Sequence, residues 1–181
     1  MFNGCSKLSD LSGTTFEDTD DDATPGSGIT SGGMQAMFQN CNSLTKIGIL
    51  INRGGCRNLL TGCNSLQSIE EFQFAKAADK YYDTYVIFGS SSTNSNIVDI
   101  TFTKTGYGPN YFVGANGNNS WYKVDFSRNS IVSLFNCLET FEGSSNTIGS
   151  SINPLGLKPT TKARLTDEDI AIATSKGWTI G

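Results

Sequence analysis

A repeat of 22 residues is the feature that most constrains what this chain can fold into. Residues 37–47 (MFQNCNSLTKI) align with residues 59–69 (LLTGCNSLQSI) on the template apolar-x-x-Cys-x-x-Leu-x-x-Leu/Ile. Residues 1–11 (MFNGCSKLSDL) fit the same template, and residues 134–141 fit it if two turn residues are deleted. A period in the low twenties is the length of one strand and one return segment, the unit of a leucine-rich repeat. Such units bury their apolar faces only by stacking on one another.

The template predicts an α/β repeat fold. We expect an irregular leucine-rich-repeat solenoid with a parallel β-sheet, short return helices and a C-terminal helical cap. Strands are predicted near residues 8–11, 44–49, 66–72, 97–102, 121–126 and 138–141. Return helices are predicted at residues 32–41 and 74–84, where apolar residues cluster on one side. The other long segments, rich in Gly, Ser, Thr and Asn, are predicted loops.

The C-terminal residues 154–181 have a different character and are predicted to cap the solenoid formed by residues 1–153. Thr166 is a natural N-cap, the three acidic residues after it favour a helix N-terminus, and Gly177 can end the helix in a left-handed conformation. A helix over residues 167–176 is therefore expected. Trp178 and the two residues after it are predicted to return as a short strand, with the indole over the core.

The loop predicted between the first two template copies, residues 12–33, carries alternating acidic residues. Asp18, Asp20 and Asp22 present oxygens at every second position, as calcium ligands often do. The glycine and the distal glutamate of an EF-hand are missing, however. A solvated acidic loop is therefore the preferred interpretation, and calcium the weaker one.

Five cysteines and the absence of histidine limit the metal and redox chemistry. There is no Cys-x-x-Cys spacing, so a zinc site is not expected, and no cofactor is predicted. Four cysteines recur at one template position, which favours small buried thiols over disulfides. These are Cys5, Cys41, Cys63 and Cys137. Cys56 lies off the template and is the expected reactive thiol.

Composition excludes several classes of function. The net charge is -4 and no Lys/Arg cluster occurs, so nucleic acids and anionic membranes are not expected partners. No apolar run approaches the roughly 18 residues of a membrane span, and no signal peptide is recognisable. Without histidine, Gly-x-Ser-x-Gly or a phosphate loop, an enzyme is not expected. A polysaccharide-acting enzyme needs only two carboxylates and is kept as a weaker alternative. Its candidates are Glu70, Glu71, Asp99, Asp125 and Glu139.

Aromatic residues are unevenly distributed. All six tyrosines and Trp121 fall in the middle third of the chain, and such side chains supply rigid contact area for proteins and flat faces for sugars. About half of them are expected to pack on the core. Tyr107, Tyr111 and Tyr122 are the predicted exposed contacts.

The template sequences MFNGCSKLSDL, MFQNCNSLTKI and LLTGCNSLQSI resemble the BspA-like leucine-rich-repeat proteins of Bacteroidetes-type bacterial surfaces and some protists. The resemblance covers about half the chain. It implies a non-catalytic adhesion or recognition module that binds a protein or glycan ligand on an extracellular, cell-surface or virion location. The alternative is a structural subunit of a phage tail or head-fibre assembly. Because Met1 already lies inside a template copy, the chain is expected to be a fragment or to have a neighbouring subunit or repeat at that end.

Overall fold

The computed structural model describes residues 1–18, 33–53, 56–75, 87–88, 94–109, 120–140 and 154–181. Its main feature is a parallel sheet of five strands that are neighbours in the order in which they occur along the chain. The strands are β1 (Asp10–Glu17), β2 (Lys46–Asn52), β3 (Ser68–Phe74), β4 (Ile97–Lys104) and the short β5 (Asp125–Phe126). The predicted α/β class with a parallel sheet is confirmed.

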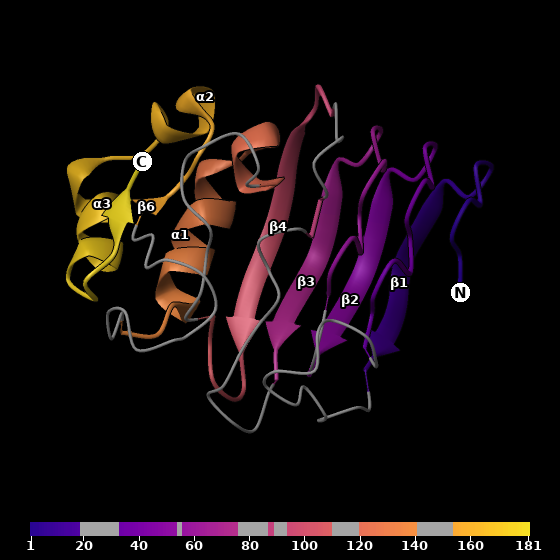
Figure 1. Ribbon diagram of the computed structural model, residues 1–181, viewed down its shortest axis with the longest axis horizontal. Helices are drawn as coiled ribbons and strands as arrows, with labels where there is room; N and C mark the ends of the chain where they lie inside the picture. Colours follow the sequence, from indigo (N-terminus) through magenta and orange to yellow (C-terminus); the bar gives the residue numbers. More distant parts are fainter. Residues whose placement is uncertain (19–32, 54–55, 76–86, 89–93, 110–119, 141–153) are drawn as a thin grey trace.

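The other elements gather at the β5 end of the sheet. They are the 3-10 helix η1 (Ser120–Lys123), α1 (Arg128–Cys137), α2 (Pro159–Lys162), α3 (Asp167–Thr174) and a parallel pair of β6 (Pro154–Leu155) and β7 (Thr179–Ile180). Figure 1 shows α1 beside β4, at the opposite end of the sheet from β1 and the N-terminus. No helix in the described residues has the length and apolar character required to cross a bilayer.

The turn before each strand repeats the same backbone geometry. The residue preceding the template cysteine has a left-handed φ of 76° at Gly4, 62° at Asn40 and 77° at Gly62. Left-handed φ is least costly for Gly and Asn, which explains why only these two residues occupy the position. The same turns in consecutive copies are joined by backbone hydrogen bonds. The N–H donors and their acceptors are Phe2 to Met37 at 2.9 Å, Phe38 to Leu59 at 3.1 Å and Leu60 to Ile87 at 2.8 Å.

The template cysteines add a second series of hydrogen bonds between consecutive copies. The Cys41 thiol donates to the Phe2 carbonyl at 3.0 Å, and the Cys63 thiol donates to the Phe38 carbonyl at 3.1 Å. Burial raises the pKa of Cys63 to about 12, so this thiol stays protonated and can act as a donor. Cys5 has the same place in the first copy, yet it is exposed, so the prediction that all four template thiols are buried is wrong there. All five cysteines are free thiols.

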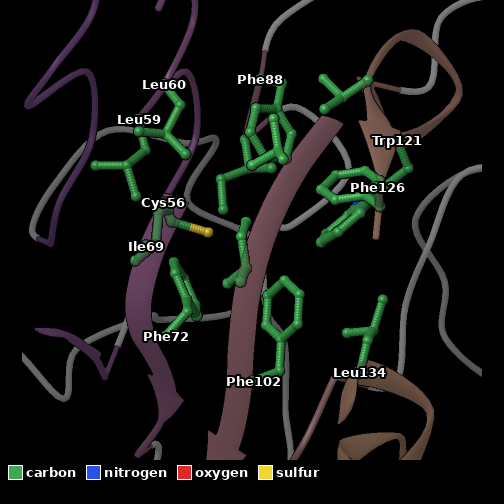
Figure 2. Packing of buried hydrophobic residues seen from close by; sticks show 14 of the residues in the cluster. Cys56, Leu59, Leu60, Ile69, Phe72, Phe88, Phe102, Trp121, Phe126 and Leu134 are labelled. Atoms are coloured by element: carbon green, nitrogen blue, oxygen red, sulfur yellow. The ribbon is translucent and has the colours of Figure 1, made fainter. Parts of the chain in front are cut away.

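Buried apolar side chains fill the space between the sheet, the turns and α1. Phe102 of β4 lies 5.8 Å from Trp121, ring centre to ring centre, and Trp121 lies 5.3 Å from Phe126 and 5.8 Å from Phe88. Figure 2 shows Trp121 and Phe126 on one side of β4, with Phe72 and the aliphatic side chains of the third copy on the other. Cys56 is fully buried in the same core, which opposes the reactivity that we predicted for its thiol.

Several predicted elements have different bounds or a different structure. β1 continues to Glu17, so the loop predicted from residue 12 begins later. Residues 33–40 form turns without a helix. β3 extends to Phe74, where the second return helix was expected to begin; Ala75 is not helical, and positions 76–84 of that prediction lie outside the described residues. Residues 121–126 form η1 and only a two-residue strand.

The largest error concerns residues 134–141. Leu134 to Cys137 are the last turn of α1, Leu138 is its C-cap, and residues 138–140 are not in a strand. The described fourth copy lies earlier in the chain. Ile87 and Phe88 take the places of Met37 and Phe38, because Ile87 accepts the hydrogen bond that this position accepts in the other copies. Asn94 is buried, and its amide donates to the Leu66 carbonyl at 2.8 Å.

The C-terminal segment follows the prediction closely. Thr166 caps α3 in a capping box with Asp169, Gly177 has a φ of 84°, and Trp178 is 1% exposed. The indole N–H of Trp178 donates to the Glu139 carbonyl at 2.8 Å. The helix ends at Thr174, two residues earlier than predicted.

Candidate functional site

The face of the sheet that points away from the core is the candidate site, and we call it the open face. In β2, Ile47 and Leu50 are fully buried in the core cluster, whereas the intervening Ile49 and the following Ile51 are half-buried and lie outside that cluster. The same alternation places polar side chains outward on the neighbouring strands. The parallel register therefore arranges the outward residues of four strands in rows.

Three rows can be followed across the strands. The first row runs Asp10, Lys46, Ser68 and Asp99, the second Thr15, Ile49 and Glu71, and the third Glu17, Ile51, Gln73 and Thr103. Adjacent members of a row are about 4.8 Å apart across the strands, and residues two apart on one strand are about 7 Å apart. Ile49 and Ile51 thus form an apolar pair in the middle of the face, with polar residues on both sides.

The polar groups around the apolar pair are held by hydrogen bonds. Glu71 accepts from the Thr103 hydroxyl at 2.5 Å and from the Gln73 amide at 3.5 Å. Arg53, just after β2, forms an ion pair with Glu17 at 2.8 Å. Both ion-pair partners are more than a third exposed, so this contact orients the side chains more than it stabilises the fold. These contacts set the positions of the polar side chains on both sides of the Ile49–Ile51 pair.

A kink in β1 shapes the part of the open face that lies next to Gly48 of β2. The register between β1 and β2 shifts between Leu11 and Thr15, and Gly13 within the shift has a φ of 70°. The Gly13 N–H is capped by the Glu70 carboxylate at 3.0 Å, although Glu70 belongs to β3. The kinked backbone lies directly on Gly48 of β2, where a Cβ would come within 2.1 Å of the Thr14 carbonyl oxygen. Only glycine fits at that position.

The charge of the open face is negative. The four long strands contain five acidic residues and two lysines, and none of these seven side chains is buried. Hydrogen bonds from Ser12 to Asp10 hold the pKa of that carboxyl below its usual value. The excess of acidic over basic side chains on these strands favours partners with basic groups.

Two of the five carboxylates considered for polysaccharide cleavage, Asp125 and Glu139, have lowered pKa values. Burial alone would raise the pKa of Asp125 and of Glu139, but hydrogen bonds outweigh this effect and lower both pKa values. Asp125 accepts from Arg164, and Glu139 accepts from Lys104 and from the Gly108 N–H. Asp99 accepts from the Ser127 hydroxyl at the start of α1. A general acid needs a raised pKa, so the direction of these two shifts is opposite to that requirement.

Two of the three predicted tyrosine contacts fall in the described residues. Tyr107 is 46% exposed and follows the C-terminal end of β4, whereas Tyr122 is 36% exposed and lies in η1, just before β5. Because the strands are parallel, these positions are at opposite ends of the sheet, so the two side chains do not share one site. Tyr111 lies outside the described residues, and the role of all three stays a prediction.

The predicted calcium ligands are only partly described. Asp18 is 8% exposed at the end of β1, and its N–H donates to the Ile51 carbonyl at 2.9 Å. Asp20 and Asp22 lie outside the described residues. Among those that are described, no cluster of three or more Asp, Glu, Cys or His side chains is arranged to hold a metal ion.

Sequence reasoning missed the Ile49–Ile51 pair. The residues belong to the continuous apolar run IGILI at positions 47–51, in which no alternation marks the outward side. A signal was available, because Ile49 and Ile51 correspond to Glu71 and Gln73 one repeat later, and an outward position is the one that tolerates such polar residues.

No protein-family model, curated protein or solved structure matches the chain.

Proposed function

We propose that this chain is a leucine-rich-repeat solenoid of the BspA-like type that serves as a non-catalytic recognition module on an extracellular or virion surface. The strands follow one another in chain order, and consecutive copies are joined by the same backbone and thiol hydrogen bonds. Both features are expected of a stacked repeat. The resemblance of the template to that family is consistent with them.

The observation that carries the proposal is the apolar pair Ile49 and Ile51 within the polar rows of the open face. A small apolar centre with a polar rim is the usual arrangement of a protein interface. Between the two expected ligand classes, the face favours protein over glycan. Sugars are commonly bound on flat aromatic faces, whereas the phenylalanines of these strands belong to, or pack against, the core.

A protein partner should match the face in shape and charge. It would insert apolar side chains over Ile49 and Ile51 and present Lys or Arg toward Glu17, Glu70 and Glu71. Electrostatic complementarity of this kind speeds association and makes binding weaken as salt increases. Such a partner also explains why the face carries few lysines of its own.

The test has two steps. A peptide-display library and a glycan array are first screened with the chain, and the best ligand from each is measured by calorimetry. The double variant Ile49→Ser/Ile51→Ser is then compared with Ile97→Ser, a matched control because Ile97 is a 52% exposed isoleucine at the start of β4. We expect a peptide ligand whose affinity falls at least tenfold in the double variant only. Ligands that bind both variants equally, or glycans as the sole hits, would overturn the proposal.

A further inference from the structure

The spacing of side chains on the open face restricts the shape of a partner that can use it. Ile51 lies beside Glu17 of β1, and Ile49 lies beside Glu71 of β3, in two consecutive rows of the sheet. Strands are about 4.8 Å apart and residues two apart on one strand about 7 Å apart, so the two glutamates stand about 12 Å apart on a diagonal. The two isoleucines lie on opposite sides of the middle of that diagonal.

The carboxylates at the two ends of the diagonal are oriented by neighbouring side chains. Both hydrogen bonds from Arg53 reach Oε1 of Glu17, at 3.2 and 2.8 Å. Oε1 of Glu71 accepts from the Thr103 hydroxyl at 2.5 Å and from the Gln73 amide at 3.5 Å. A cation on a partner would therefore meet Oε2 of each carboxylate. Arg53 already offsets the charge of Glu17, so the stronger attraction is expected at Glu71.

An α-helix matches this spacing. On a helix the residues i, i+3, i+4 and i+7 lie along one face, and positions i and i+7 are about 10.5 Å apart. Lys or Arg at i and i+7 can reach both ends of a diagonal of about 12 Å, since these side chains are long and flexible. Apolar residues at i+3 and i+4 then lie at its middle, over Ile49 and Ile51. The sequence pattern of such a helix is basic-x-x-apolar-apolar-x-x-basic.

An extended segment fits the same positions less well. On a strand, side chains that face one way are about 7 Å apart, so only one apolar residue would fall between two basic residues about 14 Å apart. Its backbone N–H and C=O groups would also face side chains, because the backbone of β2 is used in pairing with β1 and β3. A helix satisfies its own backbone groups internally.

We propose that the partner of the open face is an amphipathic helix that lies across β1, β2 and β3 along the Glu17–Glu71 diagonal. It carries basic residues at i and i+7 and apolar residues at i+3 and i+4. The proposal rests on the recognition function of the open face and specifies the structure and the sequence pattern of what that face binds. The four long strands carry five acidic residues and two lysines, so they attract a helix with basic residues and repel an acidic one.

The test uses the full chain and a display library in which one exposed helix of a small helical scaffold is randomised. We expect ligands with the pattern basic-x-x-apolar-apolar-x-x-basic that bind Ile49→Ser/Ile51→Ser at least tenfold more weakly. Glu71→Gln should weaken binding at least threefold, and Glu17→Gln less. The matched control is Glu168→Gln, which makes the same charge change at an exposed position of α3 and should leave affinity unchanged. Glu71→Lys should abolish binding, and changing the facing basic residue of the ligand to Glu should restore it.

A second library of unstructured peptides separates this proposal from the recognition function. The helix is refuted if helical ligands depend on Ile49 and Ile51 but space their basic residues differently. It is also refuted if only unstructured peptides bind through the pair and circular dichroism shows no helix in the complex. Both results leave the recognition function intact. If neither library yields a ligand that depends on the pair, the recognition function fails together with the helix.

Discussion

Replacing Ser130 with alanine should test directly whether α1 substitutes for a strand at the β4 edge. Ser130 is fully buried, and its hydroxyl accepts from the Ile100 N–H at 2.7 Å. It also lies 2.8 Å from the Ser127 hydroxyl and 3.3 Å from the Asp99 carboxylate. In Ser130→Ala the Ile100 N–H stays in the core without its acceptor. A buried backbone donor that loses its partner costs about 1–3 kcal/mol.

The magnitude must be corrected for helix propensity, because alanine is the better helix former by a few tenths of a kcal/mol. Asn136→Ala supplies the correction, since Asn136 is exposed on the same helix. Urea unfolding should show Ser130→Ala destabilised by about 1–3 kcal/mol relative to that control. Hydrogen exchange should show the Ile100 amide losing protection first. A Ser130→Ala chain as stable as the control, with an unchanged Ile100 exchange rate, would refute the idea that the helix completes the sheet.

Three further outcomes follow from the packing. Gly48→Ala would place a Cβ 2.1 Å from the Thr14 carbonyl oxygen, so we expect a loss of about 1–3 kcal/mol in urea unfolding and faster exchange in β1. Asn52 is fully buried with no hydrogen-bond partner for its amide, so Asn52→Leu should raise the unfolding free energy by about 1–2 kcal/mol; a decrease would contradict this. Hydrogen bonds from Arg128 hold the pKa of Asp169 below its usual value, so this group stabilises the fold above about pH 4 and the gain is lost as the pH falls further. In Asp169→Asn the melting temperature should depend less on pH between pH 2 and 5. The unfolding free energy at pH 7 should fall by about 0.5–2 kcal/mol.

The sequence predicts the β2–β3 part of the open face because a fixed period also fixes the register. Lys46, Ile49 and Ile51 pair with the residues that stand 22 positions later, as the repeat requires. The β1–β2 register does not follow in this way. It starts at a shift of 36 residues, equal to the spacing of Cys5 and Cys41, and changes within the kink at Gly13. A kink that depends on a carboxylate two strands away leaves no local signal.

The sequence template also misses the contacts that follow the third copy. Ile87 accepts the turn hydrogen bond from Leu60, and the buried amide of Asn94 donates to the Leu66 carbonyl, in a segment that lacks the Cys and Leu of the template. Residues 134–141 fit the template because apolar residues and Cys137 recur there through helical packing. Ile131, Leu134, Phe135 and Leu138 have spacings of three and four residues, and all are buried in α1 or at its cap. This spacing is visible in the sequence, and it predicts a helix rather than a strand for these residues.

The helix that the template search obscured also sets the direction in which this sheet can grow. The apolar template alone does not decide at which side edge of the sheet further strands can be added, since each copy can pack against a copy before it or after it. Beyond the two residues of β4 that pair with β5, α1 supplies side-chain acceptors to the β4 edge, and Arg128 and Lys176 connect that helix to the C-terminal segment. The open face proposed as the recognition surface is therefore bounded on the β4 side by a helix that the template alone does not predict.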